Sequence, residues 1–447
     1  MTNGRLISKI MRFAMPLMIT SMLQLLYNAA DVIVVGRFAG SQSLAAVGST
    51  SALINLMVNI FLGLSVGANV IAANHYGAGD YRGTQQTVHT AVAISLVGGL
   101  ALAVFGVVFG GVFLSWMGSP EDVLPLASRY IRIYFLGMPF NMLYNFGAAL
   151  LRAVGDTVRP LAFLSLSGLV NVGLNLVFVI VFHMGVAGVA LATIISQAVS
   201  AVLVLLCLIH SEGFIHLKPK EVRIHRDKLF AMMRIGLPAG LQGACFSLSN
   251  VIIQSTVNAY GSTVMAGNSA AQNIEGFIYV GMNAFHQAAV TFTSANVGAG
   301  KYSRIRRCML GCLLLVTLVG VGLDSIALFF GKGLLGVYST DPEVIAAGFI
   351  RVKLFGCTYF LCGIMEVFCG VLRGMGASIM PMIVSVMGAC AFRIFWIYAI
   401  LPLAPSLQML YYSYPVSWIL TGGVHLICYL VLLKKFPVER EAEVAAT

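Results

Sequence analysis

The stretch LRAVGDTVRP, residues 151–160, returns in the second half of the chain as LRGMGASIMP, residues 372–381. Two further pairs of short motifs keep nearly the same offset: RFAMP at 12–16 with RIGLP at 234–238, and YGAGDYR at 76–82 with VGAGKYS at 297–303. Three matches at one spacing indicate an internal duplication. We therefore predict that the chain is built from two similar halves.

The composition is that of a membrane protein. The 447 residues are 59% hydrophobic and 10% charged, with a mean hydropathy of +0.91, whereas soluble domains carry about 25% charged residues. Residues 160–211 and 235–274 contain no Asp, Glu, Lys or Arg, and such runs are long enough to cross an apolar layer ~30 Å thick. Only helices fit, because the strict alternation of a membrane β-barrel is absent.

These runs predict an all-α polytopic membrane protein with twelve transmembrane helices in two pseudo-symmetric six-helix bundles. The twelve predicted spans are residues 10–35, 46–73, 87–115, 127–151, 160–182, 186–210, 231–258, 265–295, 307–331, 345–372, 379–401 and 411–433. Six spans per half is an even number, so both halves enter the membrane from the same side. This predicts parallel repeats with a cavity between two bundles.

The domain organisation follows from the spans. We expect an N-terminal lobe at 1–210, a solvated cytoplasmic linker at 211–228, a C-terminal lobe at 229–434 and a cytoplasmic tail at 435–447. The net charge of +11 is expected to mark cytoplasmic loops rather than a nucleic-acid partner.

The distribution of Lys and Arg predicts the orientation. Of the 27 such residues, twenty fall in segments on one side and two, Arg37 and Lys332, on the other. The remaining five lie at or within spans: Arg129, Arg132, Arg351, Lys353 and Arg393. By the positive-inside rule, both termini are predicted to be cytoplasmic in a multi-pass protein of the cell (inner or plasma) membrane. The lipid bilayer is the expected partner, and the chain is expected to be monomeric.

The first span carries a carboxylate on a polar face. Gln24, Tyr27, Asn28 and Asp31 are spaced at three, four and seven residues, which is one side of a helix. An Asp at the centre of a span costs about 2.5–3.5 kcal/mol, so it should face a cavity and not lipid. Burial disfavours its charged form. It could exchange a proton near neutral pH or bind a desolvated sodium ion, or it could be a structural hydrogen-bond partner.

Three pairs of polar residues repeat at four-residue spacing in other spans. They are Asn55 and Asn59, Asn171 and Asn175, and Thr193 and Gln197. Such pairs either solvate an ion or ligand or hold helices together through hydrogen bonds, and the sequence leaves both readings open.

The second half has its own ionisable residues within predicted spans. Glu275, Asp324, Glu366 and Arg393 lie in spans eight to eleven. Arg393 is expected to pair with Glu366 or Asp324, which would lower the insertion cost of both partners. Glu275 has no obvious partner in the sequence, so we expect it to line a cavity or to be structural.

Over residues 5–435 the chain resembles the multidrug and toxic compound extrusion (MATE) transporters. Four features carry the resemblance: Pro16 followed by Asp31, GAGDYR and GAGKYS after spans two and eight, LRAVGDTVRP and LRGMG after spans four and ten, and GVAGVALAT (185–193) opening span six. The resemblance implies that a lipophilic, often cationic compound leaves as protons or sodium ions enter. It also implies no cofactor beyond the coupling ion, no metal beyond a possible sodium near Asp31, and no enzymatic activity.

The resemblance also implies roles for individual residues. The ion-coupling set is Asp31, Asn171, Asn175, Thr193 and Gln24. Independently of the resemblance, the polar residues within predicted spans that are expected to line the substrate cavity are Tyr27, Asn28, Asn55, Asn59, Asn145, Gln197, Glu275, Glu366 and Arg393. Several prokaryotic members have a second Asp where this chain has Asn175, so the choice between proton and sodium stays open.

Two alternatives are less well supported by the sequence. A lipid-linked precursor flippase of the same superfamily usually has additional spans and a more cationic cavity. An integral-membrane enzyme would need acid or His clusters at a membrane face or in a large loop, and the loops here are mostly short. A P-loop motif is absent, so direct use of ATP is not expected.

Overall fold

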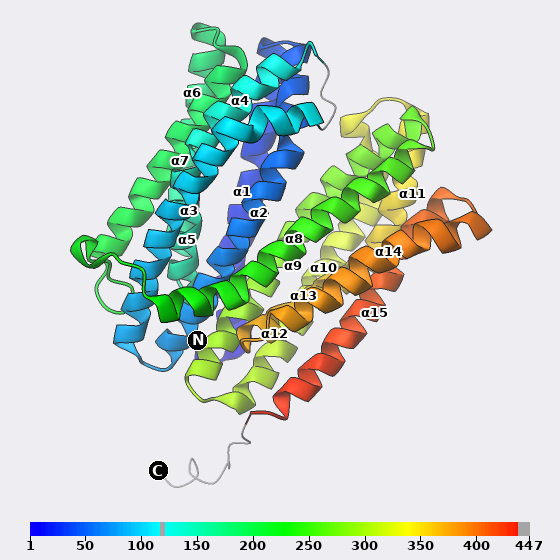
Figure 1. Cartoon of the computed structure of the whole chain (residues 1–447). Helices are drawn as coiled ribbons and strands as arrows, with labels where there is room; N and C mark the ends of the chain where they lie inside the picture. Colours follow the sequence, from blue (N-terminus) through cyan, green and yellow to red (C-terminus); the bar gives the residue numbers. More distant parts are fainter. Residues whose placement is uncertain (117–120, 437–447) are drawn as a thin grey trace. The chain divides into compact units, whose positions relative to one another are not determined.

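The computed structural model describes residues 1–116 and 121–436, and within these ranges it is almost entirely helical, without strands (Figure 1). Nine of the described helices are long and apolar enough to cross a membrane, and a bent helix pair makes a tenth. The predicted all-helical architecture is confirmed. Most of the predicted tail, from residue 437 onward, lies outside the described residues.

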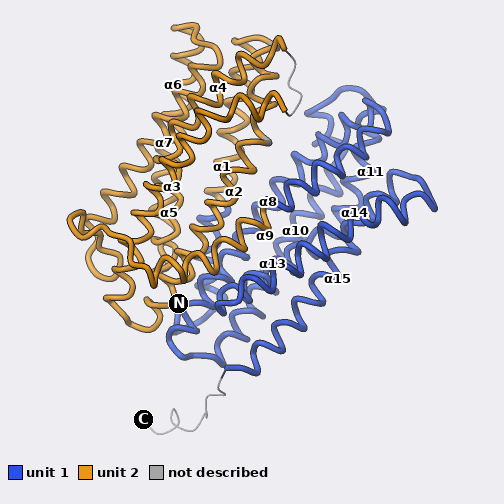
Figure 2. Tube along the Cα trace, viewed as in Figure 1, with its two compact units in different colours: residues 1–18, 245–447 blue, residues 19–244 orange. Residues whose placement is uncertain are grey.

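The chain forms two compact units (Figure 2). Unit 2 comprises residues 19–244, and unit 1 comprises residues 1–18 together with 245–447. Two helices therefore belong to both units: α1 (Leu6–Phe38) begins in unit 1, and α8 (Arg226–Asn258) begins in unit 2. The predicted lobe boundaries, at residues 210 and 229, differ from the boundaries of these two units. The division into lobes stays a prediction.

Unit 2 is a helical bundle around two apolar clusters, in which Phe135, Met138, Met142 and Phe146 are fully buried. Besides its parts of α1 and α8, its helices are α2 (Ser41–Gly77), α3 (Tyr81–Trp116), α4 (Leu124–Leu136), α5 (Met138–Ala153), α6 (Val158–Leu176), the π-helical η1 (Val177–Val181), α7 (Gly185–His210) and the 3-10 helix η2 (Pro219–Glu221).

Unit 1 surrounds one large apolar cluster that includes the fully buried Phe285, Phe292, Phe355 and Tyr411. Besides its parts of α1 and α8, its helices are α9 (Ser262–Gly298), α10 (Tyr302–Tyr338), α11 (Pro342–Thr358), α12 (Phe360–Gly374), α13 (Ile379–Ser385), η3 (Val386–Ala391), α14 (Phe392–Phe395), η4 (Trp396–Ile400), η5 (Leu401–Leu403) and α15 (Leu407–Leu433). The bent pair is α11 and α12, which meet at 51°.

All twelve predicted spans coincide with helical segments; three of these are interrupted, and a fourth, at 160–182, ends in the π-helical η1. The span predicted at 127–151 is α4 and α5, separated at Gly137. The span at 345–372 is the bent pair α11–α12, and the span at 379–401 contains two π-helical turns. Apolar runs show that a segment can cross a membrane, but they do not show where its helix breaks.

The repeated motifs are turns that require glycine. Gly79 and Gly300 have φ of +71° and +70°, and Gly155 and Gly376 have φ of +91° and +87°. The members of each pair occupy equivalent positions in the duplicated motifs. Side chains other than glycine are disfavoured at such positive φ values, so both halves use the same residue to end the same helix.

Two side chains of the linker at 211–228 pack into an apolar cluster of unit 2, while the rest of the segment is exposed or half-buried, so its description as a solvated cytoplasmic loop stays a prediction. Ile215 and Leu217 are 6% and 1% exposed and belong to one of the unit's apolar clusters. The backbone N–H of Lys218 donates to His89 Nε2 at 3.2 Å. Charge and His had suggested solvation, but the two alternate apolar side chains provide enough buried surface to hold the segment.

A polar contact fixes the start of α8 beside the turn after α2. Lys228 Nζ donates to His75 Nε2 at 2.9 Å, and His75 Nδ1 lies 2.9 Å from Asp80 Oδ2. The backbone N–H of Gly83 donates to Asp80 Oδ1 at 2.8 Å. This hydrogen bond, together with His75, lowers the pKa of Asp80, so Asp80 stays ionised in the contact.

Helices α2 and α8 approach each other through glycines spaced four apart, Gly63 and Gly67 on α2 and Gly236 and Gly240 on α8. A Cβ on Gly63 would lie 2.2 Å from the backbone nitrogen of Gly240, and one on Gly240 would lie 2.5 Å from the carbonyl oxygen of Ile60. Small residues allow this backbone contact in membrane helices.

We predict that Gly240→Ala destabilises the protein by roughly 1–3 kcal/mol, because backbone atoms cannot move aside for the methyl group. The matched control is Gly243→Ala on the same helix, where the nearest atom to the new Cβ is 3.6 Å away. That change should be neutral or slightly stabilising, because Ala favours helix over Gly. Thermal unfolding in detergent measures both, and equal melting temperatures for the two variants would contradict the close approach.

Candidate functional site

Unit 2 encloses a cavity of about 520 Å³, within the range of small-molecule sites. Its wall is mostly polar or aromatic and is built from α1, α2, α4, α5, α6 and α7. The lining residues are Gln24, Tyr27, Asn28, Asp31, Val32, Val47, Ser51, Ile54, Asn55, Leu62, Tyr130, Tyr134, Asn141, Tyr144, Asn145, Leu164, Ser167, Gly168, Asn171, Thr193, Ser196, Gln197 and Ser200. Asp31 is the one acidic residue in this wall.

Asp31 is held by an amide from α6. Asn175 Nδ2 donates to Asp31 Oδ1 and also to Asn171 Oδ1, the latter at 3.2 Å. Asn175 is fully buried and lies behind Asp31, while Asn171 lines the cavity. The four-residue spacing puts both amides on one face of α6, which is why one helix can contact the carboxylate and continue the wall.

One buried acceptor beside Asp31, the side-chain oxygen of Asn175, has no donor among the described residues. Asn175 Nδ2 uses both of its hydrogens, on Asp31 and Asn171, whereas its buried Oδ1 has no hydrogen-bond partner among the residues that the structure describes. A buried acceptor without a donor costs free energy. Protonating Asp31 or placing a cation here would supply the missing positive partner, and the carboxylate and two amide oxygens are the hard oxygen ligands that sodium accepts.

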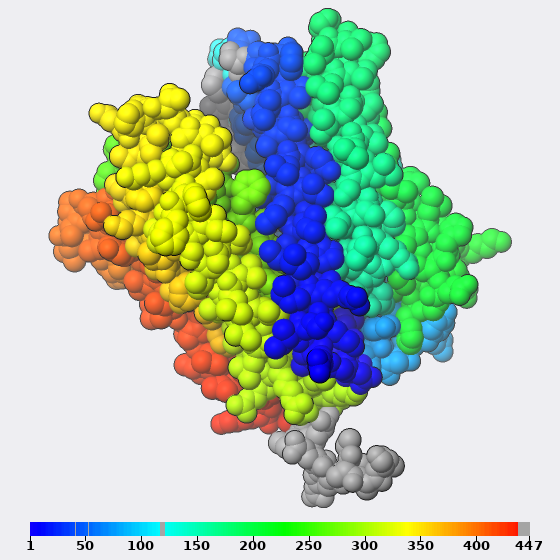
Figure 3. All heavy atoms as spheres, turned by 180° about the vertical axis from the view of Figure 1, so that it is seen from behind, coloured from blue at the N-terminus to red at the C-terminus, as the bar shows by residue number. Residues whose placement is uncertain are grey.

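Tyr27 forms another contact between α1 and α6, whose surfaces run side by side in Figure 3. Tyr27 Oη donates to the carbonyl oxygen of Ser165 at 3.2 Å. A Cβ on Gly168 would lie 1.9 Å from a carbon of the Tyr27 ring. Gly168 therefore leaves the space in which the ring sits at the cavity wall.

Sequence reasoning missed part of the wall. Tyr130 and Tyr134 of α4 stack with ring centroids 5.9 Å apart, and Asn145 Nδ2 donates to Asn141 Oδ1 at 3.0 Å. Both pairs have four-residue spacing, the same signal that identified Asn171 and Asn175. Asn145 was expected in the wall, whereas Asn141, Tyr130 and Tyr134 were not singled out in the sequence.

Most of the residues predicted for the first half meet at this cavity. Gln24, Tyr27, Asn28, Asp31, Asn55, Asn145, Asn171, Thr193 and Gln197 line it. Asn59 is not in its wall, although it shares a helix face with Asn55. Thr193 Oγ1 donates to the Val189 carbonyl at 2.9 Å, so its proton stays within its own helix. Glu275, Glu366 and Arg393 belong to unit 1 and are not part of this cavity.

Glu275 has a partner that the sequence did not indicate. Arg351 of α11 donates from Nε to Glu275 Oε1 at 2.7 Å and from Nη2 to Oε2 at 2.8 Å. Arg351 Nη1 donates to Asn268 Oδ1 at 2.8 Å, and Tyr411 Oη donates to the same oxygen at 2.9 Å. This bidentate, nearly inaccessible pair is a closed structural network.

The expected pairing of Arg393 is wrong. Arg393 forms no ion pair with any described residue, and its Nε donates to Ser417 Oγ at 2.9 Å. Glu366 Oε2 instead lies 3.3 Å from His286 Nδ1. Asp324 Oδ2 accepts from the backbone N–H of Phe360 at 3.0 Å, at the break between α11 and α12. Each of these two acids contacts a neighbouring group, and neither forms an ion pair with Arg393.

A helical membrane protein with repeated halves and a polar, partly aromatic cavity has the architecture of a secondary transporter. The MatE family model matches residues 16–177 and 238–399, two segments with the same offset that separates RFAMP from RIGLP. The chain belongs to the MatE family, as its motifs indicated. Members of this family are transporters and not enzymes.

The relatives of this chain align with it over most of their own length and most of its length. A probable multidrug resistance protein of Bacillus subtilis, YpnP, is 27% identical over 396 residues, covering 89% of this chain and 87% of that protein. The probable multidrug resistance protein NorM of Thermotoga maritima is 25% identical over 387 residues, covering 84% and 82%. The outward-facing structure of a multidrug resistance MATE transporter has a TM-score of 0.89 at 21% identity, with 97% of both chains covered, which shows a common fold.

We predict that Gly168→Ala pushes the Tyr27 ring out of its place and destabilises the protein by roughly 1–3 kcal/mol, because the new methyl group overlaps the ring. Thermal unfolding in detergent measures the difference.

The matched control is Gly173→Ala on the same helix, where a Cβ meets nothing within 4 Å. This control should unfold at the wild-type temperature or slightly above it, because Ala favours helix over Gly. A wild-type melting temperature in Gly168→Ala would contradict the tight packing of the Tyr27 ring against Gly168.

Proposed function

We propose that the chain is a cation-coupled antiporter, driven by protons or sodium ions, that exports lipophilic, positively charged organic compounds by alternating access. In this proposal it works in the cell membrane with both termini in the cytoplasm. The observation that carries the proposal is the single carboxylate, Asp31, in the wall of the unit 2 cavity.

The proposed exchange depends on charge at one position. When Asp31 is ionised, the low dielectric around it makes a positive partner strongly favourable. A proton, a sodium ion or an organic cation each supplies that charge, so occupancy by one opposes occupancy by another. Binding of the coupling ion from outside would therefore release the substrate, which is the requirement for antiport.

Asn175 and Asn171 are the proposed partners in this exchange. With Asp31 ionised, Asn175 Nδ2 donates to the carboxylate. With a proton on Asp31, rotation of the Asn175 amide would offer Oδ1, which is now without a donor, as its acceptor. With sodium, the oxygens of all three side chains would be the ligands.

The substrate class is supported by the rest of the wall. Four tyrosines, Tyr27, Tyr130, Tyr134 and Tyr144, line the cavity, and aromatic rings attract organic cations through their faces. Several relatives are named as multidrug resistance or multidrug export proteins. A wall that combines rings with amides accepts flat apolar cations without demanding one exact shape.

We predict that Asp31→Asn abolishes export coupled to an ion gradient, because the side chain keeps its size and one oxygen that can accept from Asn175 but can no longer change charge. Efflux of rhodamine 6G into everted vesicles is measured under an imposed pH gradient and, separately, a sodium gradient. The gradient that drives the wild type identifies the ion.

The control is Asp122→Asn, which neutralises an exposed carboxylate of the same unit and should leave export unchanged. Wild-type export rates in Asp31→Asn, at equal amounts of inserted protein, would exclude Asp31 as the coupling residue. Export that needs ATP and no gradient would exclude antiport altogether.

A further inference from the structure

Arg393 is a buried cation whose charge is not matched by a nearby anion in the part of unit 1 that the structure describes. It is 5% exposed, and none of the ion pairs formed by described residues includes it. A charged group taken out of water costs free energy unless a counter-charge or hydrogen bonds compensate it. Buried ionisable residues in membrane helices therefore suggest a functional role.

The guanidinium lies between aromatic rings and one hydroxyl. Its centre is 4.2 Å from the ring centroid of Tyr414 and 5.8 Å from that of Trp418. Its hydrogen bond within the described chain runs from Nε to Ser417 Oγ, so the two Nη groups face no described acceptor. The titratable groups that act on it most, Tyr414, Cys362, Cys390 and Tyr359, are neutral in their usual state near pH 7.

A second arginine in the same unit, Arg351, is buried in a similar aromatic setting but has its charge compensated. Arg351 also stacks on Tyr414, with 5.4 Å between its centre and the ring centroid. It nevertheless forms the bidentate pair with Glu275 and a hydrogen bond to Asn268. One arginine beside Tyr414 is therefore fully compensated, and the other keeps free donors.

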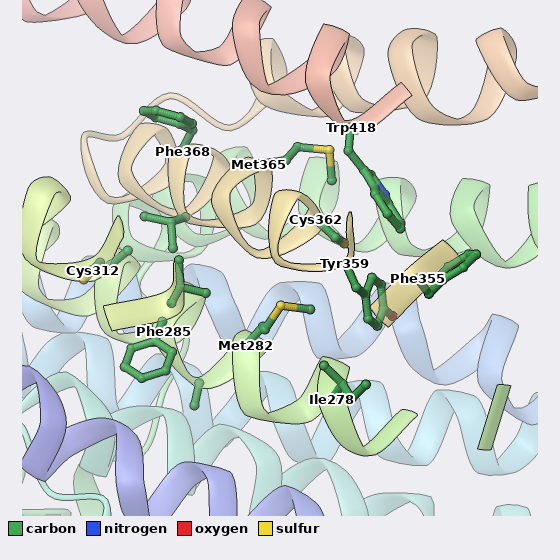
Figure 4. Packing of buried hydrophobic residues seen from close by; sticks show 14 of the residues in the cluster. Ile278, Met282, Phe285, Cys312, Phe355, Tyr359, Cys362, Met365, Phe368 and Trp418 are labelled. Atoms are coloured by element: carbon green, nitrogen blue, oxygen red, sulfur yellow. The ribbon is translucent and has the colours of Figure 1, made fainter. Parts of the chain in front are cut away.

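The backbone around Arg393 is irregular on both sides. The four-residue α14 that carries it lies between two π-helical segments, η3 and η4. π-Helical turns are rare and are frequently found at functional sites. Two aromatic side chains of α15, Tyr414 and Trp418, lie against the guanidinium. Trp418 also contacts Tyr359 and Phe355 at one end of the residues drawn in Figure 4, with the Tyr359 and Trp418 centroids 5.3 Å apart.

We propose that Arg393 binds the anionic group, a carboxylate or a phosphate, of an organic ligand. The planar guanidinium has two Nη groups directed to one side, which suits the two oxygens of such a group. The ligand would thus provide the counter-charge that the described chain does not. This anion site in unit 1 is distinct from the Asp31 cavity in unit 2.

The test uses two probes that share one ring system and differ by a phosphate, riboflavin 5′-phosphate and riboflavin. Binding to the purified full-length protein in detergent is measured by fluorescence polarisation. The wild type should bind the phosphorylated probe about tenfold or more tightly, as expected for a charge-assisted contact. Arg393→Gln should bind both probes equally, and Arg393→Lys should keep part of the preference.

The control Arg307→Gln removes one exposed charge of unit 1 and should keep the full preference. Thermal melting and gel filtration verify that each variant is folded, and if Arg393→Gln is not, the Arg393→Lys comparison carries the test. No preference for the phosphorylated probe in the wild type, including no binding, overturns the proposal. An unchanged preference in a folded Arg393→Gln variant does the same.

A last measurement separates a soluble anion from a lipid headgroup phosphate. Phosphatidylglycerol added to the micelles should leave binding of riboflavin 5′-phosphate unchanged. Displacement of the probe by this lipid would show that the site binds a lipid headgroup, and it would overturn the proposal of a soluble ligand. The binding assay requires no ion gradient. Failure of anion binding and failure of Asp31-dependent export are therefore separate results.

Discussion

The hydrogen bond from Asn175 to Asp31 is the interaction around which unit 2 is organised. A carboxylate in an apolar helix is unfavourable by a few kcal/mol, so neighbouring helices must supply polar groups at its depth. Helix α6 does so with two amides on one face, and Gly168 on the same helix leaves room for the Tyr27 ring. The cavity is the space that remains where these polar groups face away from lipid.

The two units handle buried charge in different ways. In unit 2 the one acid of the cavity wall accepts a hydrogen bond from the Asn175 amide and forms no ion pair with a described residue. In unit 1, Glu275 and Arg351 neutralise each other in a buried bidentate ion pair. Arg393, without such a partner, resembles Asp31 with the sign reversed. Although the halves share a duplicated sequence pattern, their electrostatics have diverged.

The spans could be predicted because apolar runs and flanking charges are local properties, and the face of Asp31 could be predicted because helical spacing is local too. Partner choice is not local. Arg351 seemed a residue at a span start, and only the packing of α9 against α11 brings it to Glu275. Similarly, Asn59 and Asn55 share a face, but one lines the cavity and the other does not. In the segment 211–228, the charge pattern predicted exposure, and the burial of Ile215 and Leu217 depends on packing that the pattern does not show.

Helices α1 and α8 each begin in one unit and end in the other, and this crossing constrains how the protein is made. Ile10 and Phe13 belong to the core of unit 1, where the Phe13 ring lies 5.5 Å from that of Phe292. Phe292 lies in the second half of the chain and is translated only after the whole first half. The first turns of α1 therefore remain without their packing partners until much of the second half has entered the membrane. The order of synthesis makes the first helix one of the last to reach its final contacts.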